Sequence, residues 1–168
     1  MSQSLDEFVI RFTVEEDWEI LKTVRLESLL DSPDVFSATY DTAEKYSESQ
    51  WRDRASHKTQ YQYILAIEGD RTVGMIGGTQ NPALEFNVVA MWVNPEFRGK
   101  GIADLLISAI KNLAISKGHH RMVLSVSPHN LRAVSFYSRH GFVFIPEWES
   151  VALSSGEKNQ KMECSALF

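Results

Sequence analysis

The chain has 168 residues, of which 43% are hydrophobic and 23% are charged, the ordinary balance of a globular protein that buries its own core. Its single cysteine, Cys164, excludes an internal disulfide and a cysteine-based metal cluster. The polar, acidic start of the sequence does not predict a signal segment, and no apolar run approaches the ~20 residues that span a membrane. We therefore expect one cytoplasmic domain over residues 1–168.

The net charge of −5 argues against a nucleic-acid partner. This charge is spread unevenly, because residues 1–70 hold 15 acidic and 7 basic residues, whereas residues 71–168 hold 7 acidic and 10 basic residues. Such a division suits an anionic and a cationic ligand that meet in one cleft. An ordinary unevenness of solvated surface charge explains it equally well.

Hydrophobic periodicity predicts the order β-α-α-β-β-β-α-β-α-β-β, a mixed α/β layout in which helices cover one sheet. Thr13 followed by Glu16 resembles a capping box at the start of the first helix, and Gly118 and Gly141 end two later helices. In chain order, the predictions are a strand at 7–14, a helix that ends at 31–34, a helix at 42–56, a hairpin at 61–80, a strand at 88–93, a helix at 101–117, a strand at 121–127, a helix at 130–140, and strands at 142–148 and 158–168.

Two glycines and two cations separate the strand that ends at Val93 from the helix that begins near Gly101. The first turn of a helix has unpaired N–H groups and the positive end of the helix dipole, which together bind phosphate. Gly99 and Gly101 remove side chains that would block a phosphate, and Arg98 and Lys100 add mobile cations. The loop suits a pyrophosphate, although its spacing matches neither a Walker loop nor a dinucleotide fingerprint. By itself it also fits a glycine-rich loop with exposed cations.

A second motif, NLRAVSFYSRHGF at residues 130–142, follows in the next predicted helix. With both motifs present, the chain resembles the GNAT superfamily of acetyl-CoA-dependent N-acetyltransferases. Arg98, Gly101 and Ala103 match the first family motif, [RQ]-x-x-G-x-[GA]. The second, N-x-x-A-x-x-F-Y-x-x-x-G-F, is complete. The motifs cover about residues 88–142, and the element order fits the superfamily from about residue 7 onward.

The resemblance implies the GNAT fold, an α/β (α+β) arrangement in which helices flank a mixed, mostly antiparallel sheet. Its central parallel strands, here around Met91 and Val123, splay apart and are joined by a β-α-β crossover, which we expect to be right-handed. It also implies that acetyl-CoA is the acyl donor, with its pyrophosphate on the loop, its pantetheine arm in the gap and its sulfur near Tyr137. No metal is expected. The implied cofactor-binding residues are Met91, Trp92, Val93, Arg98, Gly99, Lys100, Gly101, Ile102, Ala103, Asn130 and Tyr137.

Acetyl transfer needs a neutral amine, an oxyanion donor and a proton for the departing thiolate. A lysine-like amine with a pKa of ~10.4 is mostly protonated at pH 7, and its deprotonation costs about 4.6 kcal/mol. The hypothesis for the acid is Tyr137, whose helical face also allows a plain core role. For the base, family members carry a glutamate at a position aligned with Asn87 or near Ser125, and this chain has neither. Glu85 is the nearest substitute, but it also fits an exposed hairpin-end glutamate, and deprotonation through ordered water is the other route.

The favoured function is therefore an N-acetyltransferase that moves the acetyl group of acetyl-CoA to a primary amine of a small molecule or protein, through direct attack and a tetrahedral intermediate. A non-catalytic acyl-CoA sensor or interaction module of the same fold is the alternative. A phosphate-binding protein of another fold would have no use for the 130–142 motif. The expected partners are acetyl-CoA and an amine, without nucleic acid or membrane, and a homodimer is compatible with this interpretation. The acceptor-side candidates, whose aromatic members equally suit a core, are Glu27, Phe36, Tyr40, Trp51, Trp148 and Glu149.

Overall fold

The computed structural model describes residues 8–32, 39–150 and 158–165, which form one seven-stranded sheet in the order β1-β2-β3-β4-β5-β7-β6. The strands are β1 (Phe8–Phe12), β2 (Tyr61–Glu68), β3 (Arg71–Gln80), β4 (Phe86–Val93), β5 (Met122–Val126), β6 (Val143–Ser150) and β7 (Lys158–Cys164). The helices are α1 (Trp18–Asp31), α2 (Tyr40–Glu44), α3 (Glu48–Ala55), α4 (Ile102–Ser116) and α5 (Leu131–Arg139), with short 3-10 turns η2 (Glu15–Asp17) and η3 (Pro95–Phe97).

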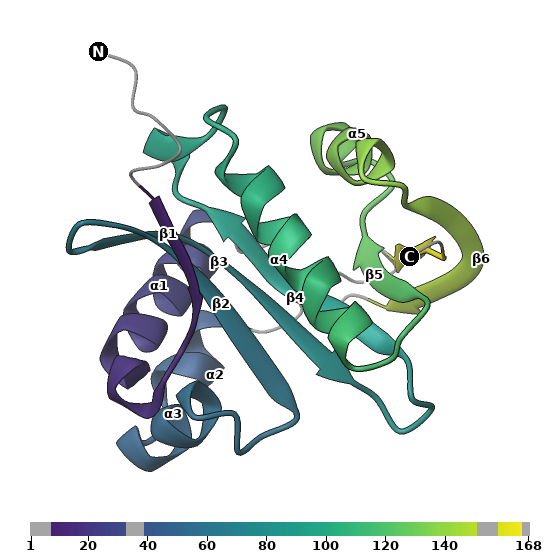
Figure 1. The fold of residues 1–168 in the computed structure, drawn as a ribbon. Helices are drawn as coiled ribbons and strands as arrows, with labels where there is room; N and C mark the ends of the chain where they lie inside the picture. Colours follow the sequence, from purple (N-terminus) through teal and green to yellow (C-terminus); the bar gives the residue numbers. More distant parts are fainter. Residues whose placement is uncertain (1–7, 33–38, 151–157, 166–168) are drawn as a thin grey trace.

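Helices cover both faces of this sheet (Figure 1). Helix α4 packs on one face through a buried stripe that includes Leu106, Ile110 and Leu113, whose spacing of three and four residues puts them on one side of the helix. Helices α1, α2 and α3 cover the other face of strands β2 to β4 and enclose a second core around Leu21 and Trp51. The predicted layout of a mixed sheet between helices is thus confirmed.

Strands β4 and β5 form the parallel pair of the sheet, and they separate almost at once. Only Phe86 with Met122 and Asn87 with Val123 are paired between them, whereas the other neighbouring strands pair antiparallel. The rest of each strand diverges, so the splayed parallel pair predicted from sequence is present. The ends of β4 and β5 therefore leave backbone groups unpaired inside the sheet.

A β-bulge occurs in β4 just where the strand leaves β5. Gly77 faces Val89 and Met75 faces Trp92, so two residues of β4 stand opposite Ile76 of β3. Ala90, inside this bulge, has a φ of 55°, which is unusual for a residue with a side chain. A bulge leaves one residue unpaired in the ladder and bends the strand. Here the bend lies beside the gap between the diverging ends of β4 and β5.

Two details of the helices differ from prediction. The helix expected over 42–56 is two, because Ser47 and Gln50 form a capping box that begins α3 anew. Thr13 does not cap the first helix, since its buried hydroxyl donates to the carbonyl oxygen of Ala55 at 2.8 Å.

The last strand stops at Cys164 instead of running through 158–168, and residues 166–168 lie outside the described part of the chain. Among the described residues, no helix is both long enough and apolar enough to cross a membrane.

Candidate active site

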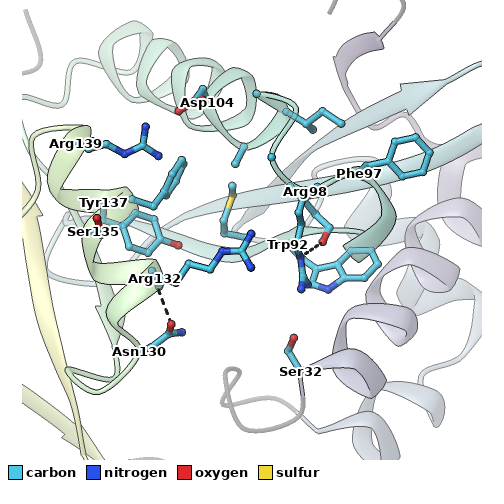
Figure 2. A pocket seen from close by; sticks show the side chains of 18 residues that line it. Ser32, Trp92, Phe97, Arg98, Asp104, Asn130, Arg132, Ser135, Tyr137 and Arg139 are labelled. Carbon is cyan, nitrogen blue, oxygen red and sulfur yellow. Dashed lines mark hydrogen bonds between the residues drawn. The ribbon is translucent and has the colours of Figure 1, made fainter. Parts of the chain in front are cut away.

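A cavity of about 660 Å³ lies where the end of β4, the loop after it, the first turn of α4 and one face of α5 meet. We call it the α4–α5 cavity. In Figure 2, Arg132 and Tyr137 point into it from α5, and Trp92 and Arg98 form the opposite wall. Apart from Lys100, every cofactor-binding residue predicted from sequence lines it. The full lining is Ser32, Met91, Trp92, Val93, Phe97, Arg98, Gly99, Gly101, Ile102, Ala103, Asp104, Asn130, Arg132, Ala133, Ser135, Phe136, Tyr137 and Arg139.

The two glycines of the loop both have left-handed backbones, with φ of 80° at Gly99 and 87° at Gly101. This conformation costs a residue with a Cβ about 1–2 kcal/mol. Glycine is therefore favoured at both positions by the backbone conformation, in addition to the room that it leaves for a ligand. Gly101 is the N-cap of α4, and no side chain of the described residues caps the helix there. The first N–H groups of α4 are therefore left for a ligand in the cavity.

Arg98 does not provide the mobile cation expected from sequence. Two contacts hold its side chain in place, and a third holds its partner, Asp31. Its Nε donates to the carbonyl oxygen of Val93 at 2.9 Å, and its Nη2 lies 2.7 Å from Oδ2 of Asp31. The same carboxylate oxygen accepts from Nε1 of Trp92 at 2.9 Å. Hydrogen bonds from Trp92, Ser32 and Arg98 lower the pKa of Asp31. Arg98 thus ties the loop to β4 and to the end of α1.

The cations that face the cavity most directly come from α5. Arg132 and Arg139 are seven residues apart, which is two helical turns, and both line the cavity. Among the described residues, Arg132 has no ion pair or hydrogen bond, and Arg139 lies over the ring of Phe136 at 5.6 Å. Lys100 instead lies over the ring of Phe97 at 5.3 Å. Neither arginine was predicted from sequence, although their spacing of seven residues on the motif helix was the available signal.

Two side-chain contacts from α4 connect it to the end of α5. Asp104, in the first turn of α4, lies 2.7 Å from Nε2 of His140 at the end of α5. Nζ of Lys111 donates to the carbonyl oxygen of His140 at 2.6 Å. Asp104 is an acid at a helix start that otherwise suits anions, and one of its carboxylate oxygens is engaged by His140.

Tyr137 lies in the last turn of α5 with its hydroxyl directed into the cavity (Figure 2). Its ring packs edge-on against Phe136 and Phe142, with ring centroids 5.4 and 5.7 Å away. Burial raises the pKa of Tyr137 to about 12, so the hydroxyl is protonated at physiological pH. Among the described residues the hydroxyl has no hydrogen-bond partner. Tyr137 therefore packs with its ring and offers a free donor with its oxygen.

Asn130 is the N-cap of α5, where its Oδ1 accepts from the backbone N–H of Ala133 at 3.2 Å. Its amide nitrogen has no partner within the described part of the chain and remains as a donor at the edge of the cavity. Asn130 thus combines a structural role with a position that suits contact with a ligand.

Glu85 does not line the α4–α5 cavity, and the structure does not bring it together with Tyr137. Its carboxylate accepts from Asn81 at 3.0 Å and from Arg121 at 2.7 Å. These two hydrogen bonds lower the pKa of Glu85, which makes it a weaker base.

The acceptor-side candidates are divided between core and surface. Trp51 is 2% exposed and belongs to the second core, and Phe36 lies outside the described residues. Glu149, on β6, accepts a hydrogen bond from Ser125 of β5 at 2.7 Å. The described residues contain no group of three or more side chains that could hold a metal ion.

Comparison with known proteins identifies relatives of this chain. Residues 24–142 match the acetyltransferase (GNAT) family. The chain is 28% identical over 106 residues to N-alpha-acetyltransferase 30 of Schizosaccharomyces pombe, a match that covers 61% of this chain and 70% of that protein.

Two solved structures have the same fold. One is the PaiA N-acetyltransferase of Thermoplasma acidophilum in complex with coenzyme A, with a TM-score of 0.70, 21% identity and coverage of 94% of this chain and 98% of that one. The other is spermidine N-acetyltransferase of Vibrio cholerae in complex with CoA and spermine, with a TM-score of 0.73, 15% identity and coverage of 96% and 98%. Because the family match spans most of its length, the chain belongs to the acetyltransferase (GNAT) family.

Proposed function

We propose that this protein transfers the acetyl group of acetyl-CoA to a primary amine by direct attack of the amine on the thioester. The observation that carries the proposal is the α4–α5 cavity, which joins a phosphate-binding helix start to the gap between β4 and β5, with the Tyr137 hydroxyl directed into it. One end of this cavity suits an anion, and the other contains unpaired backbone and a proton donor.

The donor fits the cavity in an extended pose. Its pyrophosphate lies on the backbone N–H groups of residues 98–103, where the helix dipole favours negative charge, and Arg132 and Arg139 add positive charge from α5. The pantetheine arm pairs with the backbone of residues 91–93, which β5 leaves unpaired. The free amide nitrogen of Asn130 donates to the same arm.

The chemistry then follows from three groups. A neutral amine attacks the carbonyl carbon, and an N–H freed by the bulge at Ala90 stabilises the oxyanion. The C–S bond breaks as the intermediate collapses, and Tyr137 donates its proton to the departing sulfur. The nitrogen gives up a proton that restores the tyrosine, and the products are an amide and free coenzyme A.

The relatives favour an enzyme over the non-catalytic alternative, because those described above are named as N-acetyltransferases. Their names point to two chemical classes of acceptor, an α-amine of a polypeptide and a polyamine. Both are primary amines, and we propose that the acceptor of this protein is one as well.

The test is free-thiol release from acetyl-CoA with two probe amines, spermidine and a short peptide with a free α-amino group. We expect one of them to raise the rate at least tenfold over acetyl-CoA with protein alone, and mass spectrometry should find the acetylated amine. Tight binding of acetyl-CoA without turnover of either probe would instead support the non-catalytic sensor.

A second prediction concerns the role of Arg98. If its side chain organises the loop and does not itself contact phosphate, Asp31→Ala and Arg98→Ala should each weaken acetyl-CoA binding about fivefold, or ~1 kcal/mol. The double variant should be no worse than either single one, because both remove the same interaction. Calorimetry measures all three, with Glu19→Ala, an exposed acid on α1, as the control for lost charge. Undiminished binding by Asp31→Ala beside a large loss in Arg98→Ala would mean direct phosphate contact.

A further inference from the structure

Three polar side chains meet on the half of the sheet beyond the β4–β5 gap. The hydroxyl of Ser125 on β5 donates to Oε2 of Glu149 on β6 at 2.7 Å. Nζ of Lys161 on β7 lies 3.7 Å from Oε1 of the same carboxylate. This second distance is longer than a hydrogen bond, so Oε1 keeps room for another donor.

These side chains lie on the face of the sheet opposite α4. Leu124 and Met162, the adjacent residues on β5 and β7, are buried in the core that α4 covers. Because successive residues of a strand point to opposite faces, Ser125 and Lys161 point away from that core. Tyr137 packs against the core from the α4 side. Tyr137 and Glu149 therefore belong to opposite faces of the sheet.

Three other carboxylates on this side of the molecule form ion pairs with Arg121. Glu85, Glu147 and Glu163 all surround Arg121, which directly precedes β5 at the end where β4 and β5 are still paired. Ser125 is four residues further along, or about 13 Å at ~3.3 Å per residue. It lies beyond the last paired residues, where the strands have separated. Of these four carboxylates, only Glu149 is hydrogen-bonded to a residue of β5 beyond the last β4–β5 pair.

We propose that Glu149 binds the ammonium group of the acceptor and removes its proton, as the base of the reaction. This inference rests on the proposed function. In this assignment the amine arrives from the face opposite α4, where Glu149 lies, and reaches the thioester through the gap between β4 and β5.

Each proton in this scheme has a destination. The ammonium N–H bond breaks, its proton goes to the carboxylate, and the nitrogen lone pair attacks the carbonyl carbon. The second nitrogen proton replaces the one that Tyr137 gives to the sulfur, and Glu149 returns its proton to solvent. This pairing could not be predicted from sequence, because Ser125 and Glu149 are 24 residues apart and lie on different strands.

The experiment compares Glu149→Gln with Glu147→Gln, an exposed neighbour on β6 that loses the same charge. Thiol release is followed from pH 6 to 10 with spermidine and with the α-amino peptide. At pH 7 we expect Glu149→Gln to lower kcat/KM about thirtyfold and Glu147→Gln to change it by less than twofold. The loss should shrink as pH approaches the pKa of the amine. It should also be smaller for the peptide, whose α-amine has a pKa of only ~7.7–8.0.

Two further measurements distinguish the loss of a base from a loss of activity through misfolding. The affinity for acetyl-CoA should be unchanged in Glu149→Gln, and Ser125→Ala, which keeps the carboxylate, should lose less activity while keeping the pH profile of the original protein. Full turnover by Glu149→Gln, an equal loss in Glu147→Gln, or a loss that does not depend on pH would overturn the assignment of Glu149 while acetyl transfer stands. Absence of thiol release by the unaltered protein with both probes would overturn the proposed function and this inference with it.

Discussion

Tyr137→Phe should lower kcat about 10²-fold and leave both the urea midpoint and the affinity for acetyl-CoA close to those of the original protein. Phenylalanine keeps the ring contacts with Phe136 and Phe142, so packing is preserved. What it removes is the hydroxyl directed into the cavity, and a positioned acid contributes typically ~10²–10⁴-fold.

The expected loss lies at the lower end of this range because burial raises the pKa of Tyr137 to about 12. Full transfer of its proton to a thiolate of pKa ~8.5 is uphill by roughly 3.5 units, or about 4.8 kcal/mol. The hydroxyl therefore contributes to the rate mainly as a hydrogen-bond donor to the developing thiolate, and its proton passes to the sulfur only as the nitrogen proton replaces it. The raised pKa also predicts that tyrosine ionisation causes no fall in kcat below about pH 11. Unaltered turnover in Tyr137→Phe would assign the residue to the core alone.

Gly101→Glu should weaken acetyl-CoA binding about 10²-fold, or ~2.7 kcal/mol, in calorimetry. The substitution places a side chain and a negative charge at the N-cap of α4, where the proposed pyrophosphate lies. It also imposes a φ of 87° on a residue with a Cβ, which strains the loop.

Gly118→Glu is a matched control for strain and charge. Gly118 has a φ of 83° just after the other end of α4, and nothing lies within 4 Å of a Cβ built there. The Gly118→Glu variant should lose about as much stability as Gly101→Glu and should bind acetyl-CoA as tightly as the original protein. Equal loss of binding in both variants would trace the effect to a destabilised α4 and not to the phosphate site.

The order of elements and the glycine loop that precedes α4 could be predicted because their signals are local. Alternation, helical spacing and the glycines before α4 depend on neighbours in the chain, and each is read within a short window. The break between α2 and α3 was also local, in the capping box at Ser47 and Gln50, but the continuous polar stretch masked it.

The contacts that the sequence analysis missed are long-range. Asp31 and Arg98 are 67 residues apart, and Ser125 and Glu149 are 24 apart on different strands. Such pairs depend on register and on the splay of β4 and β5, which no single window contains. The same holds for Glu85, whose partner Arg121 becomes its neighbour only when the parallel pair forms.

The short ladder between β4 and β5 affects where the sheet should open first. Two residue pairs and the bridge of Arg121 to Glu85 and Glu163 hold the closed end of this seam, while every other neighbouring pair of strands has a longer ladder. Sub-global opening should start at such a seam and release β5, β6 and β7 together as one foldon. If acetyl-CoA contacts both β4 and β5, as proposed, each tenfold excess over its Kd should raise the free energy of this opening by about 1.4 kcal/mol.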